Sequence, residues 1–186
     1  MGCNANGISS KFQSLDHIIT ELSPSVICLQ ETKVRTVGKI KSKNSKNYTI
    51  FELVRKQSRG GGLAILVKPD LNPLWISEGD DLTEIIVVEV HIKELAIRII
   101  NCYGPQETDS IERKSLFWSR LHTEVNEAMD NNIAVVIQMD GNLHLGDEVI
   151  KGDPNKMNAN GRLCSIFLKI IQQWFLSIHQ KNVKEL

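Results

Sequence analysis

The sequence lacks any apolar run long enough to cross a membrane, because no stretch approaches the roughly 20 apolar residues that a spanning helix needs. The first residues also lack the positively charged and then apolar pattern of a secretory signal. The sequence therefore predicts no membrane partner, and it favours an intracellular protein without fixing the compartment.

Cysteine and histidine are too scattered to build a soft-metal site. The 4 cysteines include no C-x-x-C spacing and the 5 histidines include no closely spaced pair, so zinc is not indicated. The glycine run in 59–62 has neither the spacing of a dinucleotide-binding loop nor the Lys-Ser/Thr that follows a phosphate-binding loop. We interpret this run as a flexible hairpin loop.

An excess of either charge is also missing, because 22 Lys and Arg residues balance 22 Asp and Glu residues. Any contact with a nucleic acid must therefore come from a local basic patch. The clearest patch is the segment 33–46, which carries Lys33, Arg35 and four further lysines and contains no acidic residue. Such a run is usually a solvated loop, although it would also suit the phosphates of a polyanion. The patch has no aromatic residue, so base stacking is not indicated.

The remaining composition fits one folded domain over residues 1–186, with 41% hydrophobic and 24% charged residues. Apolar periodicity alternates between strand-like and helix-like segments, which favours an α/β fold that begins with a βαβ unit. The expected helices cover Ser9 or Ser10 to Leu22, Ser110 to Met129, and Asn160 or Gly161 to Gln180. The expected strands cover 25–30, 48–55, 63–68, a short segment near Trp75, 84–93, 96–103 and 134–139.

Two apolar strands end abruptly in polar residues. The run Ala134–Met139 stops at Asp140, Gly141 and Asn142, and the run after Pro24 stops at Glu31. One interpretation is ordinary turn chemistry, since Asp, Gly and Asn are common in turns. The other is that Glu31 and Asp140 lie side by side at one edge of a parallel or mixed sheet. Paired carboxylates of this kind suit a hard cation such as Mg²⁺.

Four short motifs in order carry a resemblance to a known family. They are N-x-N-G from Asn4, Q-E-T-K from Gln30, N-C-Y-G-P from Asn101 and M-D-G-N-L-H from Met139. The order resembles the endonuclease/exonuclease/phosphatase superfamily, and most closely the apurinic-type endonuclease domains of non-LTR retrotransposons. The resemblance implies a four-layer α/β sandwich, with two β-sheets face to face and helices outside, and covers about the first two thirds of such a domain.

The resemblance also implies roles for individual residues. It makes Glu31 the principal ligand of Mg²⁺, or of Mn²⁺ in its place, with Asn4 and Asn6 orienting that ligand or a metal-bound water. It makes DNA the expected partner, with Lys33 and Arg35 as candidate phosphate contacts.

The catalytic roles follow in the same way. Tyr103 would contact the scissile phosphate, Asp140 would orient or deprotonate the attacking water, and Asn142 would donate a hydrogen bond to the phosphate in the transition state. His144 stands where several members also have histidine, and it is a further candidate phosphate contact. A phosphodiester needs charge neutralisation, an aligned water and donors for the developing charge, which such a set supplies.

The chain departs from the family pattern in two places. Met139-Asp140-Gly141-Asn142 stands where members have a Gly-Asp-Phe-Asn-like motif, and no Ser-Asp-His motif occurs before Leu186. We therefore expect a fold that is incomplete at its C-terminus. Three hypotheses remain open: a Mg²⁺-dependent DNA endonuclease of a retroelement, a catalytically inactive truncated remnant of the same fold, and a phosphoesterase that acts on small molecules.

Overall fold

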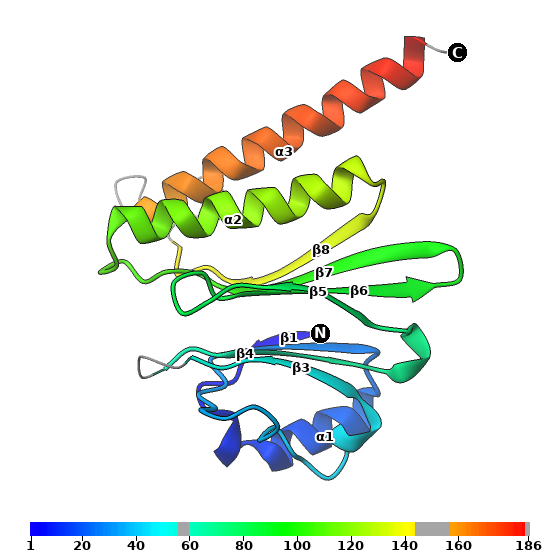
Figure 1. Cartoon of the computed structure of the whole chain (residues 1–186), viewed down its shortest axis with the longest axis vertical. Coiled ribbons are helices and arrows are strands. Elements are labelled where there is room, and N and C mark those ends of the chain that lie inside the picture. Colours follow the sequence, from blue (N-terminus) through cyan, green and yellow to red (C-terminus); the bar gives the residue numbers. More distant parts are fainter. Residues whose placement is uncertain (56–59, 144–156, 185–186) are drawn as a thin grey trace.

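The computed structural model describes residues 1–55, 60–143 and 157–184. These residues form two four-stranded sheets that lie face to face, with α1 outside one sheet and α2 and α3 outside the other (Figure 1). The predicted α/β sandwich is confirmed. The elements are β1 (Gly2–Asn4), η1 (Ile8–Ser10), α1 (Phe12–Leu22), β2 (Val26–Gln30), η2 (Ser45–Asn47), β3 (Thr49–Leu53), β4 (Leu63–Val67), η3 (Pro69–Leu71), β5 (Leu74–Glu78), β6 (Ile85–Ile92), β7 (Leu95–Tyr103), α2 (Ile111–Asp130), β8 (Ala134–Asp140) and α3 (Ala159–Lys184).

The first sheet has the strand order β1-β2-β4-β3. β1 and β2 are parallel and are joined by α1, which confirms the predicted βαβ unit. The predicted serine cap of α1 is wrong, because Ser9 and Ser10 belong to the 3-10 turn η1 and α1 begins after Lys11 without a side-chain cap. Burial of Leu15 and Ile19 against this sheet stabilises the helix instead.

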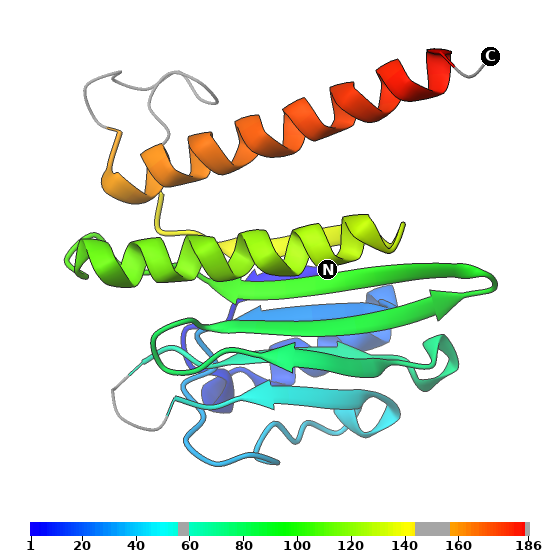
Figure 2. The same cartoon turned by 45° about the horizontal axis from the view of Figure 1, so that its top comes forward.

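The second sheet has the strand order β5-β6-β7-β8. β7 and β8 are parallel, with α2 as the crossover, so Tyr103 and Asp140 are register partners at the carboxyl ends of both strands. The helix predicted over Ser110 to Met129 is α2, and Ser110 caps it, since its hydroxyl accepts a hydrogen bond from the Arg113 amide at 3.2 Å. α3 runs beside α2 in the same general direction (Figure 2) and ends four residues beyond the predicted Gln180.

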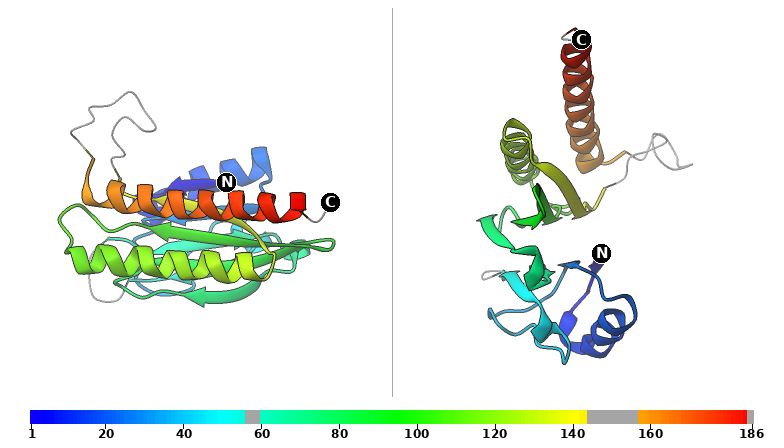
Figure 3. Two further views of the ribbon diagram at one scale, coloured as in Figure 1. Left: turned by 90° about the horizontal axis from the view of Figure 1, so that it is seen from above. Right: turned by 90° about the vertical axis from the view of Figure 1, so that its right-hand side faces the viewer.

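Alternating side chains fill three apolar layers, which explains why the central strands are apolar on both faces. Leu29 and Ile27 of β2 face α1, whereas Cys28 faces the opposite sheet. In the same way Ile100 of β7 faces α2 and Ile99 faces the first sheet. The side view in Figure 3 shows these layers stacked in the order α1, sheet, sheet, α2. None of the helices in the described residues is long and apolar enough to cross a membrane.

The carboxyl ends of β1, β2, β7 and β8 lie at the same end of the sandwich. Among the described strands, β1 is an edge of the first sheet and β8 is an edge of the second. Glu31 follows β2 and Asp140 ends β8, so the prediction that both lie at the edge of one sheet is wrong. They face each other across the two sheets, because both edges occur on the same side of the sandwich.

Candidate active site

The side-chain amide of Asn4 joins the two carboxylates that the sequence singled out. Its Nδ2 atom donates to Glu31 Oε1 at 2.9 Å and to Asp140 Oδ2 at 2.6 Å. Asn4 ends β1, directly beside Gln30 of β2 in the parallel ladder. This position places the amide between the two sheets, where it can reach a carboxylate from each of them.

Glu31 is held in a rare backbone conformation at the end of β2. Its φ is +50° and that of Lys33 is +55°, a region that costs residues with a side chain about 1 to 2 kcal/mol. Backbone bonds from both sides fix the segment, since Gly7 N donates to the Glu31 carbonyl at 2.8 Å and Lys33 N donates to the Gly61 carbonyl at 2.9 Å. Strain retained in this way is typical of functional sites.

The Glu31 carboxylate has three donors. Besides Asn4, the Tyr103 hydroxyl donates to Oε1 at 3.0 Å, and the Lys33 ammonium lies 3.4 Å from Oε2. Partial burial opposes ionisation, but hydrogen bonds from Asn4, Tyr103 and Lys33 and the charge of Lys33 together hold the pKa of Glu31 below its usual value. Glu31 is therefore ionised at neutral pH and can bind a cation.

Asn6 fixes the orientation of Asn4. Its backbone N–H donates to Asn4 Oδ1 at 2.9 Å, which leaves the Asn4 NH₂ group directed at the carboxylates. The Asn6 side-chain oxygen in turn accepts a hydrogen bond from the Lys33 ammonium. With a φ of +41°, Asn6 adopts a left-handed conformation that asparagine tolerates better than most residues.

Tyr103 and Asn142 complete the cluster from the second sheet. Burial, together with the negative charge of Glu31, raises the pKa of Tyr103 against hydrogen bonds from Gln106 and Asn142, so its hydroxyl keeps its proton at neutral pH. Asn142 has a φ of +47°, and its side-chain amide donates to the Gly104 carbonyl at 2.8 Å. Its backbone N–H also donates to Asp140 Oδ1 at 3.4 Å, which closes the Asp-Gly-Asn turn.

An open cleft of about 810 Å³ lies over Asn4, Asp140 and Asn142. Its walls come from the edge strands β1 and β8 and from the segment after β7, which contributes Gln106, Glu107 and Thr108. Sequence analysis missed this wall, although the turn residues Gly104 and Pro105 marked the loop that forms it. The cleft is large enough to admit an extended phosphate ester beside the two carboxylates.

Of the three residues predicted as candidate phosphate contacts, the structure places one in the cluster and one outside it. Lys33 belongs to the cluster through Asn6 and Glu31. Arg35 is exposed two residues further along, and among the described residues no hydrogen bond or ion pair joins it to the cluster. His144 lies outside the described residues.

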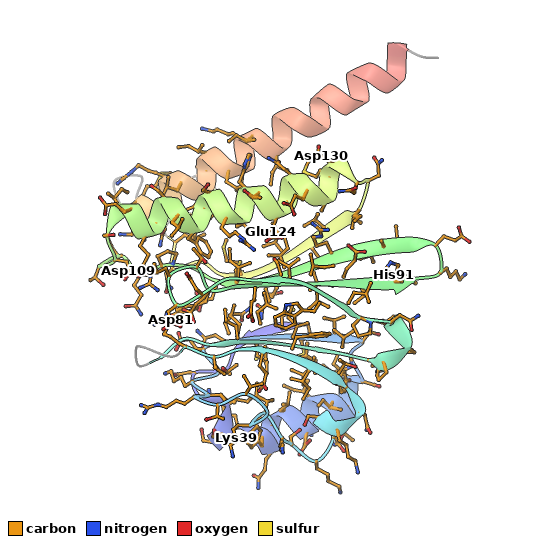
Figure 4. The ribbon with its side chains drawn as sticks, in the orientation of Figure 1. Lys39, Asp81, His91, Asp109, Glu124 and Asp130 are labelled. Atoms are coloured by element: carbon orange, nitrogen blue, oxygen red, sulfur yellow. The ribbon has the colours of Figure 1, made fainter. Side chains whose placement is uncertain are left out.

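The basic segment 33–46 is an ordered loop against α1. The backbone N–H groups of Lys43 and Asn44 donate to the Asp16 carboxylate at 3.0 and 2.8 Å. Its lysines are exposed, and Lys39 points away from the sheets beside α1 (Figure 4). The segment therefore has the properties of a solvated loop, and Lys33 at its start is the residue that contacts the cluster, through Asn6 and Glu31.

The donor set fits a hard cation. No group of three His, Cys, Asp or Glu residues that could hold a metal occurs in the part of the chain that the structure describes. Two carboxylates nevertheless meet at Glu31 and Asp140, joined by the side-chain NH₂ group of Asn4, which suits Mg²⁺ because that ion takes one or two carboxylates and keeps several waters. Sulfur does not enter the set, so a soft metal does not fit.

Two facing sheets with a carboxylate and amide cluster at the ends of their strands define the class of an α/β-sandwich nuclease or phosphoesterase. The model of the Endonuclease/Exonuclease/phosphatase family matches residues 1–137. The chain belongs to this family. No curated protein matches the chain.

Solved structures show the same fold at low sequence identity. The 3' phosphatase NExo from Neisseria, bound to a product DNA hairpin, has 16% identity and a TM-score of 0.67 over 90% of this chain and 69% of its own. An AP endonuclease from Archaeoglobus fulgidus has 22% identity and a TM-score of 0.66 over 91% and 69%. Truncated TDP2 from Caenorhabditis elegans has 20% identity and a TM-score of 0.53 over 78% and 59%.

Proposed function

We propose that this chain is a Mg²⁺-dependent phosphodiester hydrolase that cleaves DNA, of the kind found in the endonuclease domains of non-LTR retrotransposons. The observation that carries the proposal is the Asn4 amide, which holds Glu31 and Asp140 together beside the Tyr103 hydroxyl. Membership of a family of nucleases and phosphatases supports it. The DNA-bound NExo structure and the AP endonuclease among similar structures favour DNA as the substrate.

Glu31 would hold the metal, with Asn4 fixing its carboxylate and Asp140 nearby. A bound Mg²⁺, or Mn²⁺ in its place, would neutralise charge on the phosphate oxygens. The Lys33 ammonium, 3.4 Å from Glu31 Oε2, is a positive charge beside that carboxylate and would be a donor for a phosphate oxygen of the substrate. The protein contributes the alignment of these groups, which the backbone bonds around residues 31–33 preserve.

The second sheet would supply the groups that act on water and phosphate. Each Asp140 oxygen accepts one hydrogen bond, Oδ2 from Asn4 and Oδ1 from the Asn142 amide, and a remaining lone pair of the carboxylate can accept a proton from an attacking water. The Asn142 amide donates one hydrogen to the Gly104 carbonyl and lies within hydrogen-bond reach of the Tyr103 hydroxyl, and it can turn its second hydrogen from Tyr103 to the developing charge. The protonated Tyr103 hydroxyl can do the same.

The test is nicking of supercoiled plasmid DNA by the purified chain with Mg²⁺, with Mn²⁺ and with EDTA. We expect nicking with either metal and none with EDTA. Asp140→Asn should lower the rate by about 10² to 10⁴-fold, the range for loss of a general base, and Glu31→Ala should abolish metal-dependent nicking. Glu21→Gln is the matched control, because Glu21 is an exposed acid on α1 at the opposite end of β2.

Two results would contradict the proposal. Equal nicking by Glu31→Ala and the unchanged chain would mean that the activity does not come from this site. No nicking by the unchanged chain with either metal would favour the hypothesis of a non-catalytic protein with the same fold.

A further inference from the structure

Glu84 is a buried carboxylate that none of the proposed catalytic steps uses. Its exposed fraction is 3%, and it stands immediately before β6, on the face that points between the two sheets. One side-chain oxygen accepts a hydrogen bond from the Gly62 amide at 2.6 Å, and the other pairs with the Arg55 guanidinium. An acid buried this deeply must be fully paired, and its partners show what it holds in place.

The partners of Glu84 lead directly to the Glu31 segment. Gly62, whose amide Glu84 binds, accepts a hydrogen bond from Thr32 N at 3.0 Å through its own carbonyl. The neighbouring Gly61 carbonyl accepts from Lys33 N at 2.9 Å. Glu84 therefore fixes the two glycine peptides that in turn fix the residues on the C-terminal side of Glu31.

Glu84 also contacts Tyr103, which belongs to the cluster and lies on the second sheet. Its backbone carbonyl accepts a hydrogen bond from Tyr103 N at 3.0 Å. Tyr103 and Glu31, which share a hydrogen bond of 3.0 Å, are thus both connected to one residue on β6. Glu84 therefore links the backbones that carry both groups, through its side chain to Gly62 and through its backbone carbonyl to Tyr103.

The glycines are required at this contact. Gly61 and Gly62 have φ values of +62° and +85°, and a Cβ at Gly62 would lie 2.7 Å from Thr32 Oγ1. Such close approach of two backbones, with strained φ angles at Glu31 and Lys33, persists only when the surroundings hold it. The buried carboxylate of Glu84 supplies that hold through Gly62.

We propose that Glu84 is a positioning residue for the metal site, because its carboxylate, through Gly61 and Gly62, holds Glu31 and Lys33 in the geometry that binds the cation. This inference rests on the proposed function for the identity of the ligand. A buried ion pair is weak evidence for a contribution to stability. We therefore assign the Arg55–Glu84 pair a role in fixing the position of Gly62 and not a role in stabilising the fold.

The test compares Glu84→Gln with Glu89→Gln. Glu89 lies within β6 and is also a largely buried acid, 3.5 Å from the Arg98 guanidinium. It is 3.6 Å from His91, which Figure 4 labels, and lies further along the strand than Glu84, which precedes β6. Both variants lose one carboxylate from an ion pair on β6. They differ in whether that carboxylate is connected to residues 31–33.

We expect Glu84→Gln to weaken Mn²⁺ binding, measured by the electron paramagnetic resonance of free Mn²⁺, by about 10-fold or more, as loss of an outer partner of a metal ligand does. Glu89→Gln should bind Mn²⁺ as the unchanged chain does. Nicking by Glu84→Gln should recover in part at saturating Mn²⁺, whereas a general loss of folded protein would lower the rate at every metal concentration. Unchanged Mn²⁺ affinity in Glu84→Gln, or an equal loss in Glu89→Gln, would overturn the inference.

Hydrogen exchange separates this inference from the proposed function. The Thr32 and Lys33 amides should exchange faster in Glu84→Gln and not in Glu89→Gln, whether or not the unchanged chain binds a metal. Slow exchange of both amides in Glu84→Gln would contradict the positioning role.

If Glu84→Gln does not fold, Glu84→Asp replaces it, because Asp keeps the charge beside Arg55 but withdraws the oxygen from Gly62. Weaker Mn²⁺ binding and faster exchange in Glu84→Asp would then support the role. Unchanged Mn²⁺ affinity and unchanged exchange would overturn it.

Discussion

Asn101 sets the spacing of the two sheets directly beneath the candidate site. Its exposed fraction is 0%, and its side-chain NH₂ donates to the carbonyls of Leu29 and Ala64, both at 3.0 Å. Its side-chain oxygen accepts a hydrogen bond from Gln30 Nε2 at 2.6 Å. One residue of the second sheet therefore bonds three residues of the first. Asn101 is two positions before Tyr103 in β7, and its partner Gln30 directly precedes Glu31.

Replacing Asn101 with alanine should destabilise the fold strongly. The change leaves the Gln30 amide and two carbonyls without their partner in the interior, and each such group costs about 1 to 3 kcal/mol. Because neighbouring groups can relax together, we expect a total loss of about 3 kcal/mol in the free energy of unfolding. Urea unfolding measures it, with Asn47→Ala, at an exposed asparagine in η2, as the control. Equal stability of both variants would contradict this role of Asn101.

The sequence indicates the polar residues around the site but not how they are used. Asn101 was predicted to lie in the strand 96–103 and to begin the N-C-Y-G-P motif, which does not reveal that its side chain points between the sheets. Glu84 was predicted only as the first residue of a strand. A single sequence shows that a polar residue interrupts an apolar pattern, but its partners come from strands that are distant along the chain. Only these partners distinguish a polar residue in a turn from a buried polar residue that hydrogen-bonds one sheet to the other.

The strands themselves were predicted well because they are continuous apolar runs, whether a strand is fully buried, as β4 is, or only partly buried, as β8 is. Runs such as Leu63–Val67 and Ala134–Asp140 stand out by their branched apolar residues, and their boundaries agree with expectation within one or two residues. The division of the strands into two sheets was not readable in the same way. Alternation along a strand shows which residues share a face, but not which of two sheets the strand joins. The placement of Glu31 and Asp140 on one sheet was wrong for that reason.

The turn that leads into β6 contributes a pH-dependent part of the stability. Asp80 Oδ1 accepts hydrogen bonds from the backbone amides of Leu82 and Thr83 at 2.8 and 2.9 Å. The Thr83 bond is the largest cause that holds the pKa of Asp80 below its usual value, although partial burial opposes it. This turn immediately precedes Glu84, so it also fixes the backbone from which the Glu84 side chain projects.

Asp80→Asn should lower stability at neutral pH, because the amide oxygen is a weaker acceptor than the carboxylate. The folded-state pKa lies below the unfolded one, so the contribution is complete above about pH 4, the ordinary value for aspartate, and is lost as the pH falls through the lowered folded-state pKa. The difference in urea midpoint between Asp80→Asn and the unchanged chain should therefore stay constant from pH 6 to about pH 4 and shrink as the pH falls further. A difference that does not shrink below about pH 4 would contradict the linkage.

At the scale of the whole molecule, the candidate site lies between two sheets that are otherwise joined by an apolar layer. Glu31 and Tyr103 belong to different sheets, as do Asn4 and Asp140, and each pair is bridged by one hydrogen bond. The site therefore exists only when the sandwich is closed. The resemblance of four motifs in order predicted this architecture, because motifs at the ends of distant strands are brought together by the fold alone.

A cation held between the sheets should stabilise the entire sandwich, since it binds the folded chain and has no preformed site in the unfolded chain. At a Mg²⁺ concentration of about 100 times Kd the gain is about 2.7 kcal/mol, which thermal unfolding detects as a rise in Tm. Glu31→Ala should abolish the rise, because it removes the principal ligand, and Glu21→Gln should keep it. EDTA should return the unchanged chain to its metal-free Tm. An equal rise in all three proteins would instead indicate that Mg²⁺ binds elsewhere, since a cation held by Glu31 should bind more weakly once that carboxylate is removed, and a weaker affinity gives a smaller rise in Tm.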